Sequence, residues 1–77
     1  DIQSKVENIA RSQMEYMFSL PYLEPPSDYP TISVPQGYGV TCQAQEYVVG
    51  DPNIAKVVVT VSVGGTPQLA LETLRAK

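Results

Sequence analysis

Residues 54–63, Ile-Ala-Lys-Val-Val-Val-Thr-Val-Ser-Val, decide the fold of this chain. Valine occupies every second position from 57 to 63, whereas Lys56, Thr60 and Ser62 lie between or beside them. Successive side chains of a strand point to opposite faces of a sheet, and β-branched residues are favoured there. The stretch therefore predicts a long strand with one valine face that needs a cover.

Turn signals on both sides of this strand predict an antiparallel meander. After it, Gly64-Gly65 is a two-residue hairpin signal, and Gln68 to Leu74 is a predicted returning strand with Leu69 and Leu71 inward. Before it, residues 50–53 (Gly-Asp-Pro-Asn) form a predicted turn, because proline presets the backbone after an aspartate that can cap the turn. Strands joined by such short connections pair antiparallel.

The segment from Tyr38 to Val49 predicts the strand that precedes this turn. Alternation places four small or apolar side chains on one face: Tyr38, Val40, Cys42 and Ala44. Three polar side chains lie on the other face: Thr41, Gln43 and Gln45. The alternation breaks at residues 46–49, where we expect a bulge or the end of the strand.

The first 20 residues carry the pattern of an amphipathic helix. Apolar side chains recur there at spacings of three and four: Ile2, Val6, Ile9, Ala10, Met14, Met17 and Phe18. Gln13 lies near this apolar face and weakens it, and Leu20-Pro21 ends the helix because proline disfavours helical geometry in the preceding residue. The helix is the only available cover for the valine face.

These predictions combine into a single α+β domain, residues 1–77. It comprises a helix over residues 1–20, a proline-rich loop over 21–37 and a β-meander of three to four strands over 38–75. Five of the seven prolines lie between Pro21 and Gln36. Within the loop, Thr31 to Val34 is a candidate short strand that Pro35 limits to an edge position.

Composition argues against enzymatic catalysis, metal binding and nucleic-acid binding. The chain has 77 residues, a formal charge of −3, one cysteine and no histidine. A serine or cysteine nucleophile therefore lacks its usual base, an internal disulfide is excluded, and a zinc site would need carboxylates alone. The five basic residues are scattered, which is unlike a nucleic-acid interface. We expect no enzymatic activity and no catalytic, cofactor or metal site. We also expect that the chain binds neither nucleic acid nor a small-molecule substrate.

Individual candidates have simpler interpretations. Cys42 lies in mid-strand and is expected to be a small buried residue rather than a reactive thiol. Gly37-Tyr38-Gly39 starts like a dinucleotide-binding loop, but a strand follows where that motif needs a helix. Two acidic pairs, Glu24 with Asp28 and Glu46 with Asp51, lack the dense ligand spacing of a calcium loop.

Several stretches resemble the type IV pilin superfamily, which includes the pseudopilins of type II secretion. Residues 8–17 (Asn-Ile-Ala-Arg-Ser-Gln-Met-Glu-Tyr-Met) are similar to the stretch where a pilin helix enters its globular head, and Leu20-Pro21-Tyr22 to the element that ends that helix. Residues 50–63 resemble the turn and β-branched strand of minor pseudopilins, and Leu71 to Leu74 their last strand.

The resemblance implies a non-enzymatic structural subunit, a minor pilin or pseudopilin of a type II secretion or type IV pilus fibre. Helical periodicity starts at Ile2, so we expect a soluble head cut from a longer protein whose apolar stem anchors it in the inner membrane. The head would lie in the periplasm or outside the cell. Paired C-terminal cysteines of major pilins are not present, which favours a minor subunit.

The implied partners are other pilin or pseudopilin subunits. The expected contacts come from the helix and the proline-rich loop: Ile2, Val6, Ile9, Met14, Met17, Tyr22 and Tyr29. An alternative function is a free-standing protein-binding module that uses the helix and the loop, with an aromatic surface formed by the five tyrosines.

Overall fold

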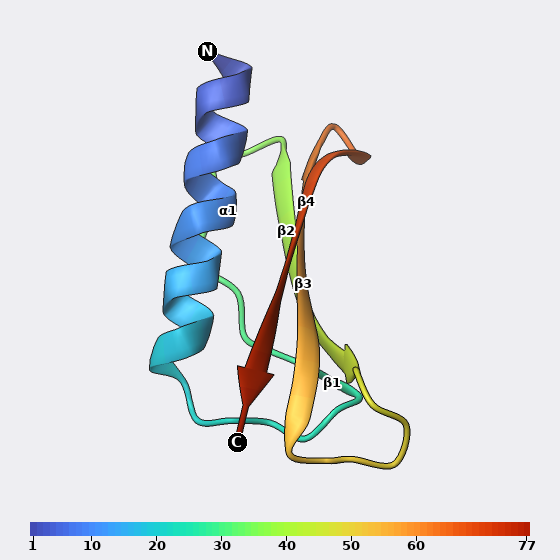
Figure 1. Ribbon diagram of the computed structural model, residues 1–77. Coiled ribbons are helices and arrows are strands. Elements are labelled where there is room, and N and C mark those ends of the chain that lie inside the picture. Colours follow the sequence, from blue (N-terminus) through green and yellow to red (C-terminus); the bar gives the residue numbers. More distant parts are fainter.

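One helix covers one face of a four-stranded antiparallel sheet, which confirms the predicted α+β class. A computed structural model describes all 77 residues. The elements in chain order are α1 (Ile2–Ser19), β1 (Ser27–Asp28), β2 (Tyr38–Glu46), β3 (Ile54–Val63) and β4 (Thr66–Ala76). The strands lie side by side in the same order as in the chain, and each pair is antiparallel (Figure 1).

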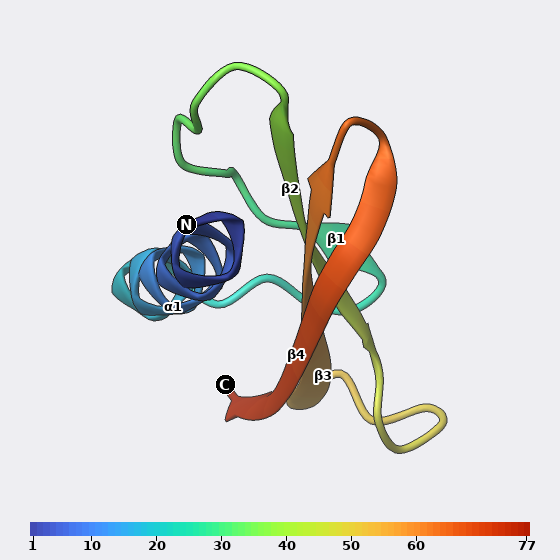
Figure 2. The ribbon, with the colours of Figure 1, turned by 90° about the horizontal axis from the view of Figure 1, so that it is seen from above.

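Helix α1 begins and ends for identifiable reasons. The Asp1 carboxylate accepts a hydrogen bond from the backbone N–H of Ser4 at 2.8 Å, which satisfies one of the free donors of the first turn. At the other end Leu20 is extended, with φ −93° and ψ 157°, as expected for a residue before proline. Seen along its axis, the helix lies on one side of the sheet only (Figure 2).

The core lies between this helix and the middle of the sheet. Four alternate residues of β3 are completely buried: Ala55, Val57, Val59 and Val61. Cys42 and Ala44 of β2 are buried beside them, and Val6, Ile9, Ala10 and Met17 close the core from the helix. Each fully buried valine contributes roughly 1.5–3 kcal/mol. The predicted valine face is therefore the centre of the domain.

The strand register confirms the predicted inward faces. Val59 lies opposite Cys42 of β2 on one side and opposite Leu71 of β4 on the other. Leu69 similarly lies opposite Val61, and a β-bulge follows between Val61 and Ser62. The helix does not cover the sheet evenly, because Leu71 is 37% exposed whereas Val59 is completely buried.

Some predicted boundaries were wrong. The last strand is longer than predicted at both ends. By contrast, β2 ends at Glu46, within the stretch where a bulge or the end of the strand was expected. Thr31 to Val34 forms no strand. The short edge strand is Ser27–Asp28 instead, which pairs with Ala44 and Gln43.

Candidate interaction surfaces

Gln13 fastens the proline-rich loop to the helix. Its side chain is completely buried. Its Nε2 donates to the backbone carbonyl of Pro30 at 3.0 Å, and its Oε1 accepts from the backbone N–H of Ile32 at 2.8 Å. Because this N–H is bound to the helix, residues 31–34 cannot use it in a strand ladder. The interpretation of Gln13 as a weakness of the apolar face was wrong.

The loop tyrosines are also engaged within the chain. Tyr29 is 3% exposed, its hydroxyl oxygen accepts from the backbone N–H of Leu23 at 3.0 Å, and its own N–H donates to the Cys42 carbonyl at 2.9 Å. The Tyr22 hydroxyl donates to the carbonyl of Pro52 at 2.8 Å. These bonds hold the loop against both the sheet and the β2–β3 turn.

Arg75, near the end of β4, caps the C-terminal end of α1. Its Nη1 donates to the Met17 carbonyl at 2.7 Å and its Nη2 to the Leu20 carbonyl at 2.5 Å. A cation at this position donates hydrogen bonds to free carbonyls and interacts favourably with the negative end of the helix dipole. Three aromatic rings have centroids 5.7–6.0 Å from its Cζ: Phe18, Tyr22 and Tyr29.

Sequence reasoning missed this role of Arg75. The sequence shows only one of five scattered basic residues, because the carbonyls that it binds are 55 and 58 positions earlier. The role of Gln13 had a detectable signal, since the residue shares the helical stripe of Ala10 and Met17 at spacings of three and four. A polar residue within such a stripe indicates a specific buried partner.

Most of the expected subunit contacts lie inside this domain. Val6, Ile9, Met17 and Tyr29 belong to its own core. Met14 and Tyr22 are half-buried, and Ile2 is 57% exposed. Only the last three offer surface to another molecule.

A first exposed apolar surface is the groove between α1 and β4. It has a volume of about 370 Å³ and is lined by Glu7, Arg11, Met14, Leu69 and Leu71. The leucines come from the inward face of β4 and the other three side chains from the helix. The groove is the place where the helix leaves the sheet uncovered.

A second exposed apolar surface is the tip of the β2–β3 loop. Tyr47, Val48 and Val49 are 53%, 49% and 93% exposed. The acidic residues around them serve the turn itself, because Glu46 accepts from the backbone N–H of Gly50 at 3.1 Å and Asp51 from that of Asn53 at 2.9 Å. Both carboxylates of this acidic pair are therefore engaged in local backbone hydrogen bonds.

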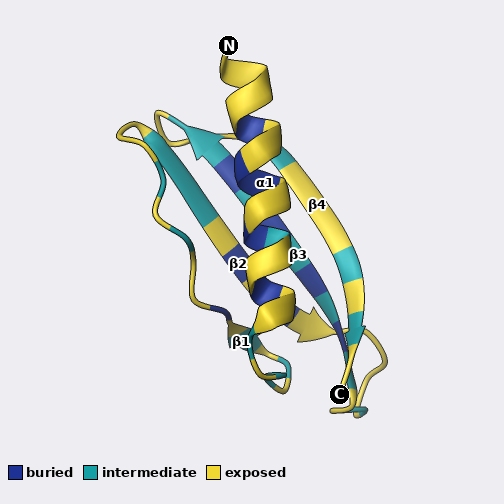
Figure 3. Ribbon diagram, turned by 90° about the vertical axis from the view of Figure 1, so that its left-hand side faces the viewer, coloured by how far each residue is buried: buried dark blue, intermediate teal, exposed yellow.

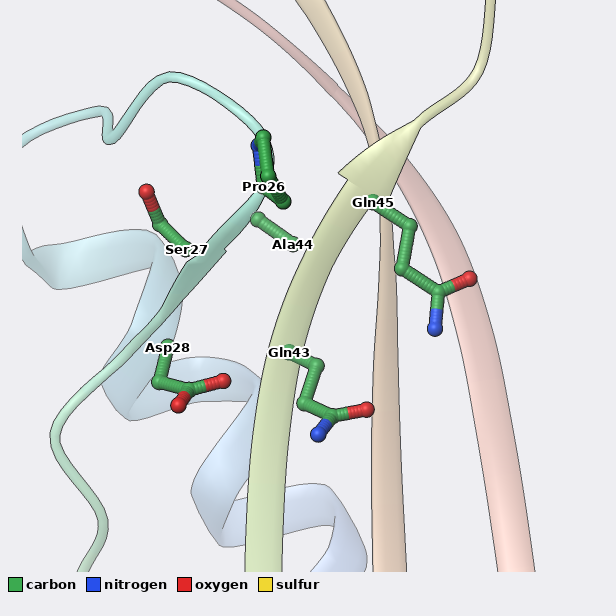
Figure 4. Close-up of a pocket in the computed structure, with 6 residues that line it drawn as sticks. All are labelled: Pro26, Ser27, Asp28, Gln43, Ala44 and Gln45. Carbon is green, nitrogen blue, oxygen red and sulfur yellow. The ribbon is translucent and has the colours of Figure 1, made fainter.

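The remaining hollow of note is polar. It has a volume of about 320 Å³ and lies at the β1–β2 edge, lined by Pro26, Ser27, Asp28, Gln43, Ala44 and Gln45 (Figure 4). Its only charge is the Asp28 carboxylate, and Asp28 lies opposite Gln43 in the strand register. No three His, Cys, Asp or Glu side chains in the chain gather into a possible metal site.

Comparison with known proteins does not indicate a function for these surfaces. No family model, curated protein or solved structure matches the chain. The apolar run of α1 falls short of what a membrane-spanning helix needs. A helix on an antiparallel sheet serves many functions, so the function must be argued from the exposed surfaces.

Proposed function

We propose that this domain is the head of a minor pilin or pseudopilin, a non-enzymatic structural subunit of a type II secretion or type IV pilus fibre. The observation that carries the proposal is the exposed first turn of α1. Residues 1–5 are all exposed, Val6 is the first buried residue, and the helix extends past the end of the sheet (Figure 1).

In the proposal the helix continues beyond the domain, and an upstream turn would take over the donors of the first turn, one of which the Asp1 carboxylate binds in this structure. Ile2 makes no contribution to the core, yet it keeps the apolar spacing of the buried residues that follow. No other element lies over this end of the helix in Figure 1, so an upstream extension has room along the same axis. In the proposal this extension is the apolar stem, which anchors the subunit in the inner membrane and then packs among the stems of neighbouring subunits.

The chemistry of the head supports a structural role. The Cys42 thiol is 2% exposed, and burial raises its pKa, so the reactive thiolate is disfavoured at neutral pH. Gln13 and Arg75 bind backbone atoms of this same chain. These two side chains thus hold elements of the fold together.

Two experiments test this proposal. The first is to read the gene upstream of Asp1, where the proposal requires an apolar helix of about 20 residues. The second is cysteine cross-linking in cells that produce the full-length protein, with Cys42 left in place because it is buried. Ile2→Cys is expected to cross-link to another subunit, whereas Asn53→Cys, exposed before β3, serves as the matched control.

A reading frame without an apolar helix would overturn the proposal. So would equal cross-linking at both positions, since contact near the stem should be specific to the N-terminal end of α1. In either case the second candidate function, a free-standing protein-binding module, gains support. Its best surface is the β2–β3 loop tip, because Val49 is 93% exposed while the loop residue Tyr29 is buried.

A further inference from the structure

The two edges of the sheet are finished in different ways. Beside β2 lie the short strand β1 and the proline-rich loop, which Gln13 and Tyr29 fasten to the helix and to β2. Nothing lies beside β4, which forms the opposite edge (Figure 3). An open edge strand carries unpaired N–H and C=O groups and is a ready template for another strand.

The usable part of this edge runs from Leu69 to Ala76. Pro67 has no N–H to donate, and the bulge opposite Val61 and Ser62 distorts the strand near it. The eight residues from 69 to 76 contain neither proline nor glycine. One end of the edge is therefore protected, and the other end can accept a partner.

The groove beside this edge shows which kind of partner fits. Its floor is the inward face of β4, where Leu71 stays 37% exposed although its register partner Val59 is completely buried. A partner strand alone would leave this floor open. A partner that adds a strand and also brings a helix on the same side of the sheet would cover it.

The charges on the groove are complementary to those of a second copy of this chain. Glu7 and Arg11 line the groove one helical turn apart and have opposite signs. Arg11 has no ion-pair partner in the chain, whose one ion pair joins Lys56 and Glu72. A two-fold axis perpendicular to the sheet would run the second helix antiparallel to the first on the same face, and Glu7 of each copy would then face Arg11 of the other.

We propose that two copies join through antiparallel pairing of their β4 strands, with the two-fold axis at Leu71. In this register Leu71 lies opposite Leu71 of the second copy, and Leu69 lies opposite Thr73 of the second copy. These side chains all lie on the helix side of the resulting eight-stranded sheet. Centring one residue later would instead oppose two Glu72 side chains, which is unfavourable. Both α1 helices then lie on one face and together cover the leucine floor. The proposal does not depend on the fibre role.

Swapping the two groove charges tests whether the partner is a second copy, because only then does the double swap restore opposite charges across the interface. Sedimentation equilibrium of the 77-residue chain over a concentration series measures its dimerisation, with Glu7→Arg, Arg11→Glu and the double swap as variants. Each single variant opposes like charges at two symmetric places, so we expect its dissociation constant to rise by roughly tenfold. The double swap restores opposite charges and is expected to regain the wild-type constant.

Further measurements distinguish this interface from association through another surface. Leu71→Lys is expected to give a monomer, and Val49→Asp, an equally drastic change at the exposed loop tip, is expected to leave the dimer intact. Melting curves show whether each variant is folded, and the amides of residues 69–73 that point away from β3 should exchange more slowly as the dimer forms. A wild-type chain that stays monomeric, a double swap that does not regain association, or loss of the dimer in Val49→Asp would each overturn the proposal.

Discussion

Replacing Gln13 tests whether one buried amide holds the loop to the helix. Gln13→Leu keeps most of the side-chain volume and removes both hydrogen bonds, to Pro30 and Ile32. Each lost bond leaves a partly buried backbone group without its partner, at a cost of about 1–1.5 kcal/mol. We therefore expect the free energy of unfolding to fall by about 2–3 kcal/mol. A domain of this size has roughly 4–11 kcal/mol in total, so the loss is large.

Urea denaturation gives this difference from the shift in midpoint, provided that the slope is unchanged. Asn8→Leu is the matched control, because it makes a similar change at an exposed helical position and should shift the free energy by less than about 0.5 kcal/mol. Hydrogen exchange adds a local measurement: the Ile32 amide should lose protection in Gln13→Leu. Wild-type stability in Gln13→Leu together with a protected Ile32 amide would refute the reasoning.

Three further predictions concern other contacts. Arg75→Gln removes the charged cap of α1 and should lower the free energy of unfolding by about 2 kcal/mol in thermal melts; an unchanged melting temperature would contradict this role. Tyr22→Phe removes one exposed hydrogen bond and should cost only about 0.5 kcal/mol in urea titrations, so a loss comparable to that of Arg75→Gln would show a larger role for its hydroxyl. Burial raises the pKa of Cys42, so the unfolded thiol ionises first, and stability is fully present below about pH 8.5 and is lost as pH rises further. This alkaline loss should be smaller in Cys42→Ala, and identical pH profiles of the two proteins would exclude the effect.

Local patterns were sufficient to predict the helix and the three long strands of this fold, although not the short strand β1. The alternation of valines in β3 predicted both the strand and its buried face, and the apolar spacing of α1 predicted which side of the helix packs on it. Both patterns repeat within one element, so each additional residue supports the same conclusion. The α+β class followed because the sheet had only one possible cover.

The contacts that fasten the elements together were not predictable in the same way. Thr31 to Val34 has the composition of a strand, but its Ile32 amide is bound by Gln13 across 19 positions. The Arg75 cap depends on where the end of β4 comes to lie beside the end of α1, which no local pattern specifies. The groove could not be predicted either, because it depends on how far the helix reaches over β4.

The Arg75 cap also joins the first and the last element of the fold. The C-terminal carbonyls of α1 obtain their charged partner only when β4 has paired with β3, across a separation of 55–58 residues. Most of the stability of a helix within a protein comes from the packing of its apolar face against other elements. The end of the helix and the last strand should therefore become ordered in one late, cooperative step, and the long loop that this step closes favours slow folding for so small a domain.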